Sequence, residues 1–464
     1  MINMDGNRNR HLTRIIVLFF AINFLGIFNS FAQQADEYIP LKYSTKSYSK
    51  NKTKFYNTKI NKYKFYSKDD KINKLYKDYL YKLYLSHSEA SKSKQFIAEP
   101  RLVNYLNKIL DTILKSNGIT EKFEVVLTRY TSPNAFNMGD NRLYVNMGLF
   151  KLTKNEAQLA FVIAHELSHK LLSHVEQNFI AHQEKIKNKE FKKEIRDINR
   201  AKFNKLDKSI QFIKNAKYDF AKYSRQFESA ADSFAVEIIK NTNYEMVSIE
   251  RFFMSLENAD VDTTEINYNT YFANKNDKIK DEWIFKDNTP LTFGDSKLFD
   301  FDEDSLKTHP DMKNRTALIK QKLSGLKYEA QNIKEFLIDK NAFDTLLLAS
   351  DMEELELYKL NKRYSALVFY SLKIIPKYPN YNFLYRNVAE NLDLLYKAIN
   401  KHEVQKHIPI ESEDLANGYN DLLRIIDRTT TKEFELIVKN FLNNFQSKLA
   451  SYPNLKSLYN EYNK

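Results

Sequence analysis

This sequence of 464 residues contains no cysteine. The chain can therefore form no disulfide, and it has no cysteine to which a lipid could be attached at an export-signal junction. A long apolar run is also missing near the N-terminus. The apolar stretch 15–28 has roughly 14 residues, is interrupted by Asn23, and falls short of the about 20 residues that cross a bilayer. This shortness argues against a transmembrane anchor, which is the alternative interpretation of the stretch.

The first 32 residues have a distinct order of residue types. Three arginines precede the apolar stretch, and Ser30-Phe31-Ala32 follows it. Basic, apolar and small-residue segments in this order are typical of a secretory signal. The pattern predicts a signal peptide over residues 1–32, cleaved after Ala32, and an exported bacterial protein that is periplasmic or otherwise extracytoplasmic.

The charge balance of the chain is positive, with a net charge of +13. Such a balance is compatible with peripheral contact with acidic membrane surfaces or with nucleic acid. The lysines, however, are spread along the whole chain, as on a solvated surface, and no nucleic-acid-binding motif accompanies them. We therefore expect no specific nucleic-acid binding.

The composition divides the chain into segments. Residues 33–70 are rich in Lys and Tyr and have no acidic residue between Pro40 and Lys68, which predicts a flexible tether. The remaining length and the hydrophobic content of 43% exceed what one folding unit needs. We expect one domain at 71–325 and a C-terminal helical region at 326–464.

Hydrophobic periodicity predicts a mostly α fold with a small β-sheet (α+β). Two helices are expected between 71 and 118, followed by strands at 123–127 and 142–147 that are joined by turn-forming residues. The sequence after that is helical in pattern. Residues 357–379 are similar to one tetratricopeptide unit, but their small-residue positions are out of step and no second good copy follows.

The stretch AHELSHKLLSH, residues 164–174, carries three of the nine histidines. Thr153 followed by Glu156 has the pattern of a capping box, so we expect the stretch to lie in the middle of one long helix. On such a helix, about 400° of rotation and about 6 Å of rise separate His165 from His169. Both imidazoles then point to the same side, where they can share one metal ion.

The remaining side chains of the stretch are expected at other angles. Glu166 lies about 100° round the helix from His165, within reach of a metal-bound water but not of the metal. His174, about 140° beyond His169, is expected to face elsewhere as a residue of the polar face. The alternative for the whole motif is a buried, hydrogen-bonded histidine pair without a metal.

A third metal ligand must come from another part of the chain. In one large class of His-Glu-x-x-His enzymes it is a histidine six residues after the second, behind a glycine, but Val175 and Leu172 occupy those positions here. The other known arrangement takes a glutamate from a separate helix. The segment SRQFESAADSFAVEI provides Glu228, and Asp232 follows one turn later.

Small residues surround this acidic pair and would let two helices approach closely. Asp232 would then accept a hydrogen bond from the outer nitrogen of a ligand histidine, which fixes the tautomer of that histidine and raises its basicity. The alternative is a solvated acidic pair on an exposed helix face.

Three ordered motifs resemble the gluzincin zinc metallopeptidases of the HtpX, BepA and Oma type, which are related to the CaaX prenyl protease (peptidase family M48). The motifs are NAF…RLYVNMGLF…NEAQLAFVIAHELSHKLLSH, SRQFESAAD and THPDMKNR, and they lie between about Asn134 and Arg315. Ser168 departs from the glycine that usually precedes the second histidine. The tether and the C-terminal third are not covered by the resemblance.

The resemblance implies a zincin-like peptidase domain with endopeptidase activity on proteins or peptides. It implies one Zn²⁺ per chain, held by His165, His169 and Glu228. Three protein ligands leave a fourth position for water, as in a catalytic zinc site. Glu166 would act as the general base that takes a proton from that water and later returns it to the leaving amine.

Other groups are expected around this centre. The strand at 142–146 would offer its edge to an extended substrate, and Asn134 would help to hold the substrate backbone. Following the resemblance, His309 would donate to the developing oxyanion or act as a closing ligand. A plain turn residue before Pro310 is the alternative for His309.

Two functional hypotheses follow. The first is an exported zinc endopeptidase that acts on envelope proteins in quality control or processing. The second is a binding or chaperone-like protein whose C-terminal helices dock an envelope partner protein, with a metal site that is vestigial or regulatory.

Overall fold

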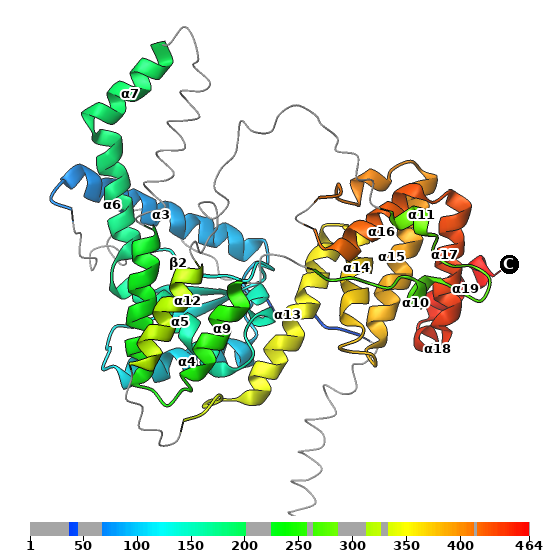
Figure 1. The fold of residues 1–464 in the computed structure, drawn as a ribbon, viewed down its shortest axis with the longest axis horizontal. Helices are drawn as coiled ribbons and strands as arrows, with labels where there is room; N and C mark the ends of the chain where they lie inside the picture. The colour runs from blue at the N-terminus through cyan, green and yellow to red at the C-terminus, as the bar shows by residue number, and fades with distance from the viewer. Residues whose placement is uncertain are drawn as a thin grey trace, which may run out of the picture. The chain divides into compact units, whose positions relative to one another are not determined.

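The computed structural model describes residues 37–44, 67–200, 224–257, 263–285, 312–325, 333–412 and 415–463. The predicted signal peptide, most of the tether and His309 lie outside these ranges. The chain forms two compact units (Figure 1). The sheet-containing unit joins Leu41–Asp260 with Thr289–Glu354, and the helical unit joins Met1–Pro40 and Val261–Asn288 with Leu355–Lys464. The units interleave along the sequence, whereas we expected consecutive segments that divide at residue 325.

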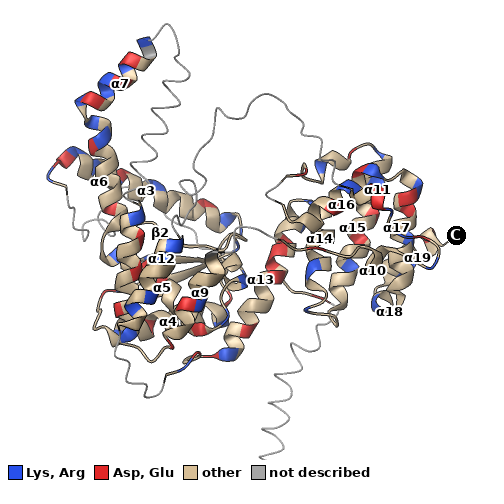
Figure 2. Ribbon diagram, viewed as in Figure 1, with Lys and Arg blue, Asp and Glu red and all other residues tan. Residues whose placement is uncertain are grey.

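The prediction of a mostly α fold with a small β-sheet is confirmed. The sheet-containing unit has these elements in chain order: α3 (Asp70–Lys92), α4 (Pro100–Ser116), β1 (Glu124–Thr128), β2 (Ala135–Asn137), β3 (Arg142–Asn146), η2 (Met147–Lys151), α5 (Glu156–Leu171), α6 (His174–Lys187), α7 (Lys189–Arg200), a helix at 224–240, α9 (Val247–Glu257), α12 (Met312–Ser324) and most of α13 (Lys340–Leu360). On α7, Figure 2 shows basic and acidic residues interspersed along the ribbon, which is typical of a solvated helix.

The sheet has three strands in the order β1-β3-β2. β1 runs parallel to β3, with Val125 opposite Leu143, and β2 runs antiparallel to β3, with Phe136 opposite Tyr144. The connection that we expected to consist of turns therefore contains a strand of its own. β3 is the central strand, so the prediction that it offers a free edge to substrate is wrong, and β2 lies at the edge instead.

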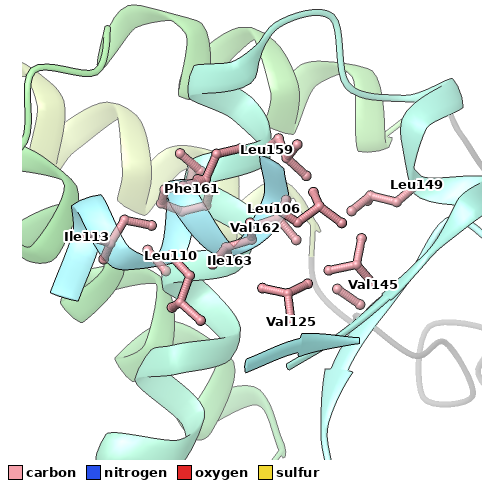
Figure 3. Close-up of a cluster of buried hydrophobic side chains, with 14 of the residues drawn as sticks. Leu106, Leu110, Ile113, Val125, Val145, Leu149, Leu159, Phe161, Val162 and Ile163 are labelled. Atoms are coloured by element: carbon pink, nitrogen blue, oxygen red, sulfur yellow. The ribbon is translucent and has the colours of Figure 1, made fainter. Parts of the chain in front are cut away.

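The core lies between this sheet and two helices, α4 and α5. Apolar residues recur on α4 every three or four positions, and Leu106, Leu110 and Ile113 are fully buried. Figure 3 shows these side chains facing residues of α5 and the valines Val125 and Val145 of the sheet. α5 differs from α4 because every residue from 156 to 168 is buried. A helix that is covered on all sides is held in place by its surroundings, and it provides a fixed base for the histidine motif.

The first turn of α5 is fixed by Asn155 and Glu156. Asn155 is the N-cap, and its side-chain oxygen accepts a hydrogen bond from the backbone N–H of Gln158. The predicted capping box of Thr153 and Glu156 is therefore wrong. The buried carboxylate of Glu156 instead accepts five hydrogen bonds of 2.8 to 3.1 Å, from the backbone N–H groups of Leu337, Ile338 and Asp339 and the hydroxyls of Tyr105 and Tyr244.

The helical unit consists of helices joined by short connections: α10 (Asn269–Phe272), α11 (Asp281–Ile284), α14 (Tyr364–Ile374), α15 (Asn382–Asn400), η5 (Val404–Lys406), α16 (Asn417–Arg428), α17 (Thr431–Asn444), α18 (Gln446–Leu449) and α19 (Pro453–Tyr462). The segment 263–285 contributes α10 and α11 to this unit. They pack on α17 and α16. Within the described ranges, no helix combines the length and apolar content needed to span a membrane.

Replacing Glu156 with alanine should destabilise the sheet-containing unit. Five donors, two of them buried tyrosine hydroxyls, would lose their common acceptor, and we expect the free energy of unfolding to fall by about 3–5 kcal/mol. Urea unfolding followed by circular dichroism measures this change. The matched control is Glu237→Ala, because the side chain of Glu237 is 54% exposed and its loss should change stability by less than about 0.5 kcal/mol. Equal effects of both substitutions would contradict the prediction.

Candidate metal centre

The histidine motif lies at the C-terminal end of α5, and not in the middle of a long helix as predicted. α5 ends at Leu171, and a new helix, α6, begins at His174. The break occurs because Ser173 has a left-handed backbone conformation with φ of 57°, which no residue inside a right-handed helix adopts. His165 and His169 remain on consecutive turns of α5, on one side of the helix.

Two imidazole nitrogens and one carboxylate converge on a common point. The Nε2 atoms of His165 and His169 lie 3.1 Å apart. Glu228, from the helix at 224–240, places Oε2 3.5 Å from His165 Nε2 and Oε1 3.3 Å from His169 Nε2. Within the described part of the chain, these three residues form the one group of His, Asp and Glu whose ligand atoms are close enough to hold a metal ion.

Asp232 lies one turn beyond Glu228 and contacts the outer face of His165. Its Oδ1 atom is 2.9 Å from His165 Nδ1, and its side chain is fully buried. Burial by itself lowers the pKa of His165, but the hydrogen bonds and charges of Asp232 and Glu228 outweigh burial and raise that pKa to about 10. The metal-free ring therefore carries a proton on both nitrogens at neutral pH, and a metal ion would displace the proton on Nε2.

Arg315, on α12, completes this network. Its Nε and Nη2 atoms donate hydrogen bonds of 2.7 and 2.8 Å to the two carboxylate oxygens of Asp232. Its Nη1 atom lies 2.9 Å from Glu228 Oε2, and its guanidinium lies over the ring of Phe253. Burial would raise the pKa of Asp232, but the charge and hydrogen bonds of Arg315 hold it below the ordinary value.

Sequence reasoning did not identify the contribution of Arg315. The residue stands at the end of the THPDMKNR motif, so the motif gave a signal, but nothing in its spacing says which side chains it meets. Pairing with an acidic residue 83 positions away follows only from the packing of α12 beside the helix at 224–240.

His174 also lies at the centre, contrary to our prediction that it faces elsewhere. The break at Ser173 turns His174 back toward α5, and its Nδ1 atom is 3.0 Å from His169 Nδ1. The ring is stacked on Phe227, with ring centroids 4.4 Å apart. Burial and the neighbouring His169 lower the pKa of His174 to about 4, so the ring is neutral at neutral pH.

The other predicted site residues have different outcomes. Glu166 is buried beside this group, with 5% of its surface exposed, and it adds to the negative charge that acts on Arg315. Asn134 immediately precedes β2, and β2 packs beside α5. His309 lies outside the described residues.

Comparison with known proteins finds a family model that matches this region of the chain. Residues 100–323 match the model of peptidase family M48. This match covers the sheet, both histidines, Glu228, Asp232 and Arg315, and it confirms the resemblance that the three motifs indicated.

Individual relatives match shorter parts of the chain. The beta-barrel assembly-enhancing protease of Yersinia pestis is 31% identical over 84 residues, which is 18% of this chain and 17% of the relative. The same protease of Escherichia coli has the same identity and coverage. The mitochondrial metalloendopeptidase OMA1 of Schizosaccharomyces pombe is 32% identical over 71 residues, 15% of this chain and 21% of the relative. The chain thus matches only about a fifth of each relative's length.

Replacing Arg315 with methionine should destabilise the metal-free protein at neutral pH. Two buried carboxylates would lose their cation, and breaking a buried pair costs about 3–5 kcal/mol. The pKa of Asp232 is held low in the native protein, so its contribution to stability is present above about pH 4 and is lost as the pH falls. Unfolding midpoints of the two proteins should therefore converge in acid.

The matched control for this prediction is Arg251→Met. The side chain of Arg251 is 59% exposed on α9, and its replacement should change the free energy of unfolding by less than about 0.5 kcal/mol. A deficit in the Arg315 variant that is independent of pH would show that lost packing, and not lost charge, causes it.

Proposed function

Residues 100–323 match the model of peptidase family M48, and from this we propose that the protein is a zinc-dependent endopeptidase. The observation that carries the proposal is the convergence of His165 Nε2, His169 Nε2 and Glu228 from two helices. Three protein donors with a further position for water are typical of a catalytic zinc site, whereas structural sites have four protein ligands.

The spacing of the three donors fits zinc. Tetrahedral bonds of about 2.0–2.1 Å place neighbouring donor atoms about 3.3 Å apart. The two Nε2 atoms are 3.1 Å apart, and the carboxylate of Glu228 approaches His165 Nε2 at 3.5 Å through Oε2 and His169 Nε2 at 3.3 Å through Oε1. Two imidazoles and one carboxylate are also a donor set that zinc prefers over calcium or magnesium, which take oxygen ligands. We therefore assign the site to one Zn²⁺ per chain.

The chemistry divides between the metal and Glu166. When bound, zinc supplies Lewis-acid polarisation of a peptide carbonyl and makes water acidic near neutral pH. Glu166 is the residue after His165 and lies buried beside the donor set, where its carboxylate can take a proton from the attacking water. It then returns that proton to the leaving amine. Asp232 holds the outer nitrogen of His165 and so keeps its inner nitrogen free to act as a donor to the metal.

We place the substrate along β2. Asn146 donates its backbone N–H to the carbonyl of Asn134 at 3.0 Å. Because hydrogen-bonded pairs alternate in an antiparallel ladder, Ala135 directs its backbone N–H and C=O away from β3. An extended peptide can add to that outer side as a further strand. Asn134 is then next to the bound backbone, and His309 is assigned to the oxyanion or to closing of the site.

The substrate class and the location of the enzyme are part of the proposal. The order of segments in residues 1–32 supports export to the bacterial envelope, so we propose envelope proteins as substrates, in quality control or processing. Residues 355–464 of the helical unit lie beyond the family match, whereas its residues 261–288 lie within that match. We assign to the helical unit the binding of an envelope partner protein or of the substrate itself.

Replacing Glu166 with glutamine should abolish peptide hydrolysis and leave zinc in place. Glutamine has nearly the same shape but cannot accept a proton, and loss of a general base lowers kcat by about 100- to 10,000-fold. Zinc content is measured by plasma emission, and activity is measured with a casein-type substrate. Glu237→Gln is the matched control and should retain full activity. Equal cleavage of the substrate by the Glu166 variant and the native protein would refute the proposed endopeptidase mechanism.

The second candidate function is that of a binding protein or chaperone that uses the helical unit. An experiment in cells distinguishes it from the endopeptidase. A strain that carries only Glu166→Gln should behave like the deletion strain if proteolysis is the function. Full complementation by that variant would instead support the binding protein. Growth under envelope stress, compared between the two strains, measures the difference.

A further inference from the structure

We propose that His174 is a positioning residue for the metal ligand His169, whose tautomer and ring orientation it fixes by a hydrogen bond. The inference rests on the proposed metal site, but not on peptide hydrolysis. It begins from a contact between two ring nitrogens, His174 Nδ1 and His169 Nδ1, which lie 3.0 Å apart.

The contact allows one arrangement of protons when a metal is bound. His169 Nε2 faces Glu228 and His165, so this nitrogen must be unprotonated to act as a ligand. Its proton is then on Nδ1, which becomes a donor. The atom opposite that donor is His174 Nδ1, which must accept, so His174 carries its own proton on Nε2. His174 therefore selects the tautomer of His169 that can bind a metal.

The backbone is shaped to bring His174 to this place. His174 would lie about 140° round the helix from His169 if α5 continued. The left-handed conformation of Ser173, with φ of 57°, ends α5 and starts α6 with His174 as its first residue. A residue other than glycine adopts this conformation rarely, and such residues gather at functional sites.

Packing holds the His174 ring on its other side. The ring is stacked on Phe227 with an interplanar angle of 20°, and 5% of the residue is exposed. The ring of His174 thus contacts the ligand His169 on one side. On its other side it contacts Phe227, the residue that precedes the ligand Glu228. This arrangement orients the acceptor lone pair of His174 toward His169.

The two ligand histidines thus have different supports. His165 Nδ1 meets the carboxylate of Asp232 at 2.9 Å, while His169 Nδ1 meets the imidazole of His174 at 3.0 Å. A hydrogen-bond acceptor of either kind, placed at the nitrogen that does not bind the metal, restricts the orientation of the ligand ring. Losing such an acceptor typically weakens metal binding by about 10- to 100-fold.

The test measures zinc binding by the purified protein, with metal removed and then titrated back against a competing chelator. His174→Asn places an amide oxygen near the position of Nδ1, whereas His174→Gln places it near the position of Nε2. His174→Phe keeps a ring for stacking on Phe227 and removes the acceptor. We expect the Phe and Gln variants to bind zinc about 10- to 100-fold more weakly, and the Asn variant to recover most of that loss.

The matched control is His182→Phe, on the same helix α6 but outside the donor set, which should bind zinc like the native protein. Native affinity in the Phe variant, or equal affinities of the Asn and Gln variants, would overturn the proposal in favour of packing. The Asn and Gln pair decides the question even if the Phe variant does not fold. A native protein that binds zinc but cleaves no peptide would contradict the proposed function and leave this comparison valid.

Discussion

The centre depends on one buried cation, the guanidinium of Arg315. It bonds both oxygens of Asp232 and lies 2.9 Å from Glu228, so it connects α12 to the helix that carries both carboxylates. Asp232 then contacts His165 on α5, and three helices share one charge network. Buried charges are tolerated only when they are paired. Arg315 offsets one of the two carboxylates that it touches, and Glu166 adds another negative charge nearby. A divalent cation between His165, His169 and Glu228 would balance what remains.

The position of the histidines is set from the opposite end of α5. Glu156 begins the helix and fixes it to residues 337–339 and to two tyrosines, while apolar residues cover the middle. A helix that is buried on all sides and bonded at its first turn has little freedom to shift along its axis. The ligand nitrogens at its last two turns are therefore held at separations that a small metal ion requires, before any metal binds. Such preorganisation reduces the cost of binding.

Local periodicity was sufficient to predict the two pairs of residues that make up the centre, whereas the resemblance to the peptidase family was needed to bring the two pairs together. His165 with His169, and Glu228 with Asp232, are each four residues apart, and helix geometry places such pairs on one side without knowledge of the fold. The position of His174 could not be predicted in the same way, because α5 ends near Ser173 and the sequence has no glycine or proline there to signal the end of a helix. Predicting the contacts of Arg315 would have required knowing where α12 packs. Predicting the edge position of β2 would have required knowing how this three-residue strand pairs. Each error concerned either where an element ends or which distant element lies beside it.

The folded unit around the centre extends beyond the region that resembles the peptidase family. The family match ends at residue 323, yet the first turn of α5 depends on backbone donors at 337–339. Farther along, Glu353 on α13 forms a buried ion pair of 2.5 Å with Arg129, which follows β1, and it also accepts a hydrogen bond from the backbone of Leu41. A chain cut at residue 325, where the sequence suggested a boundary, would leave Arg129 without Glu353 and Glu156 without its three backbone donors. The residues that the chemistry needs are therefore contained in the family match, whereas the residues that hold them in place continue to about Glu354.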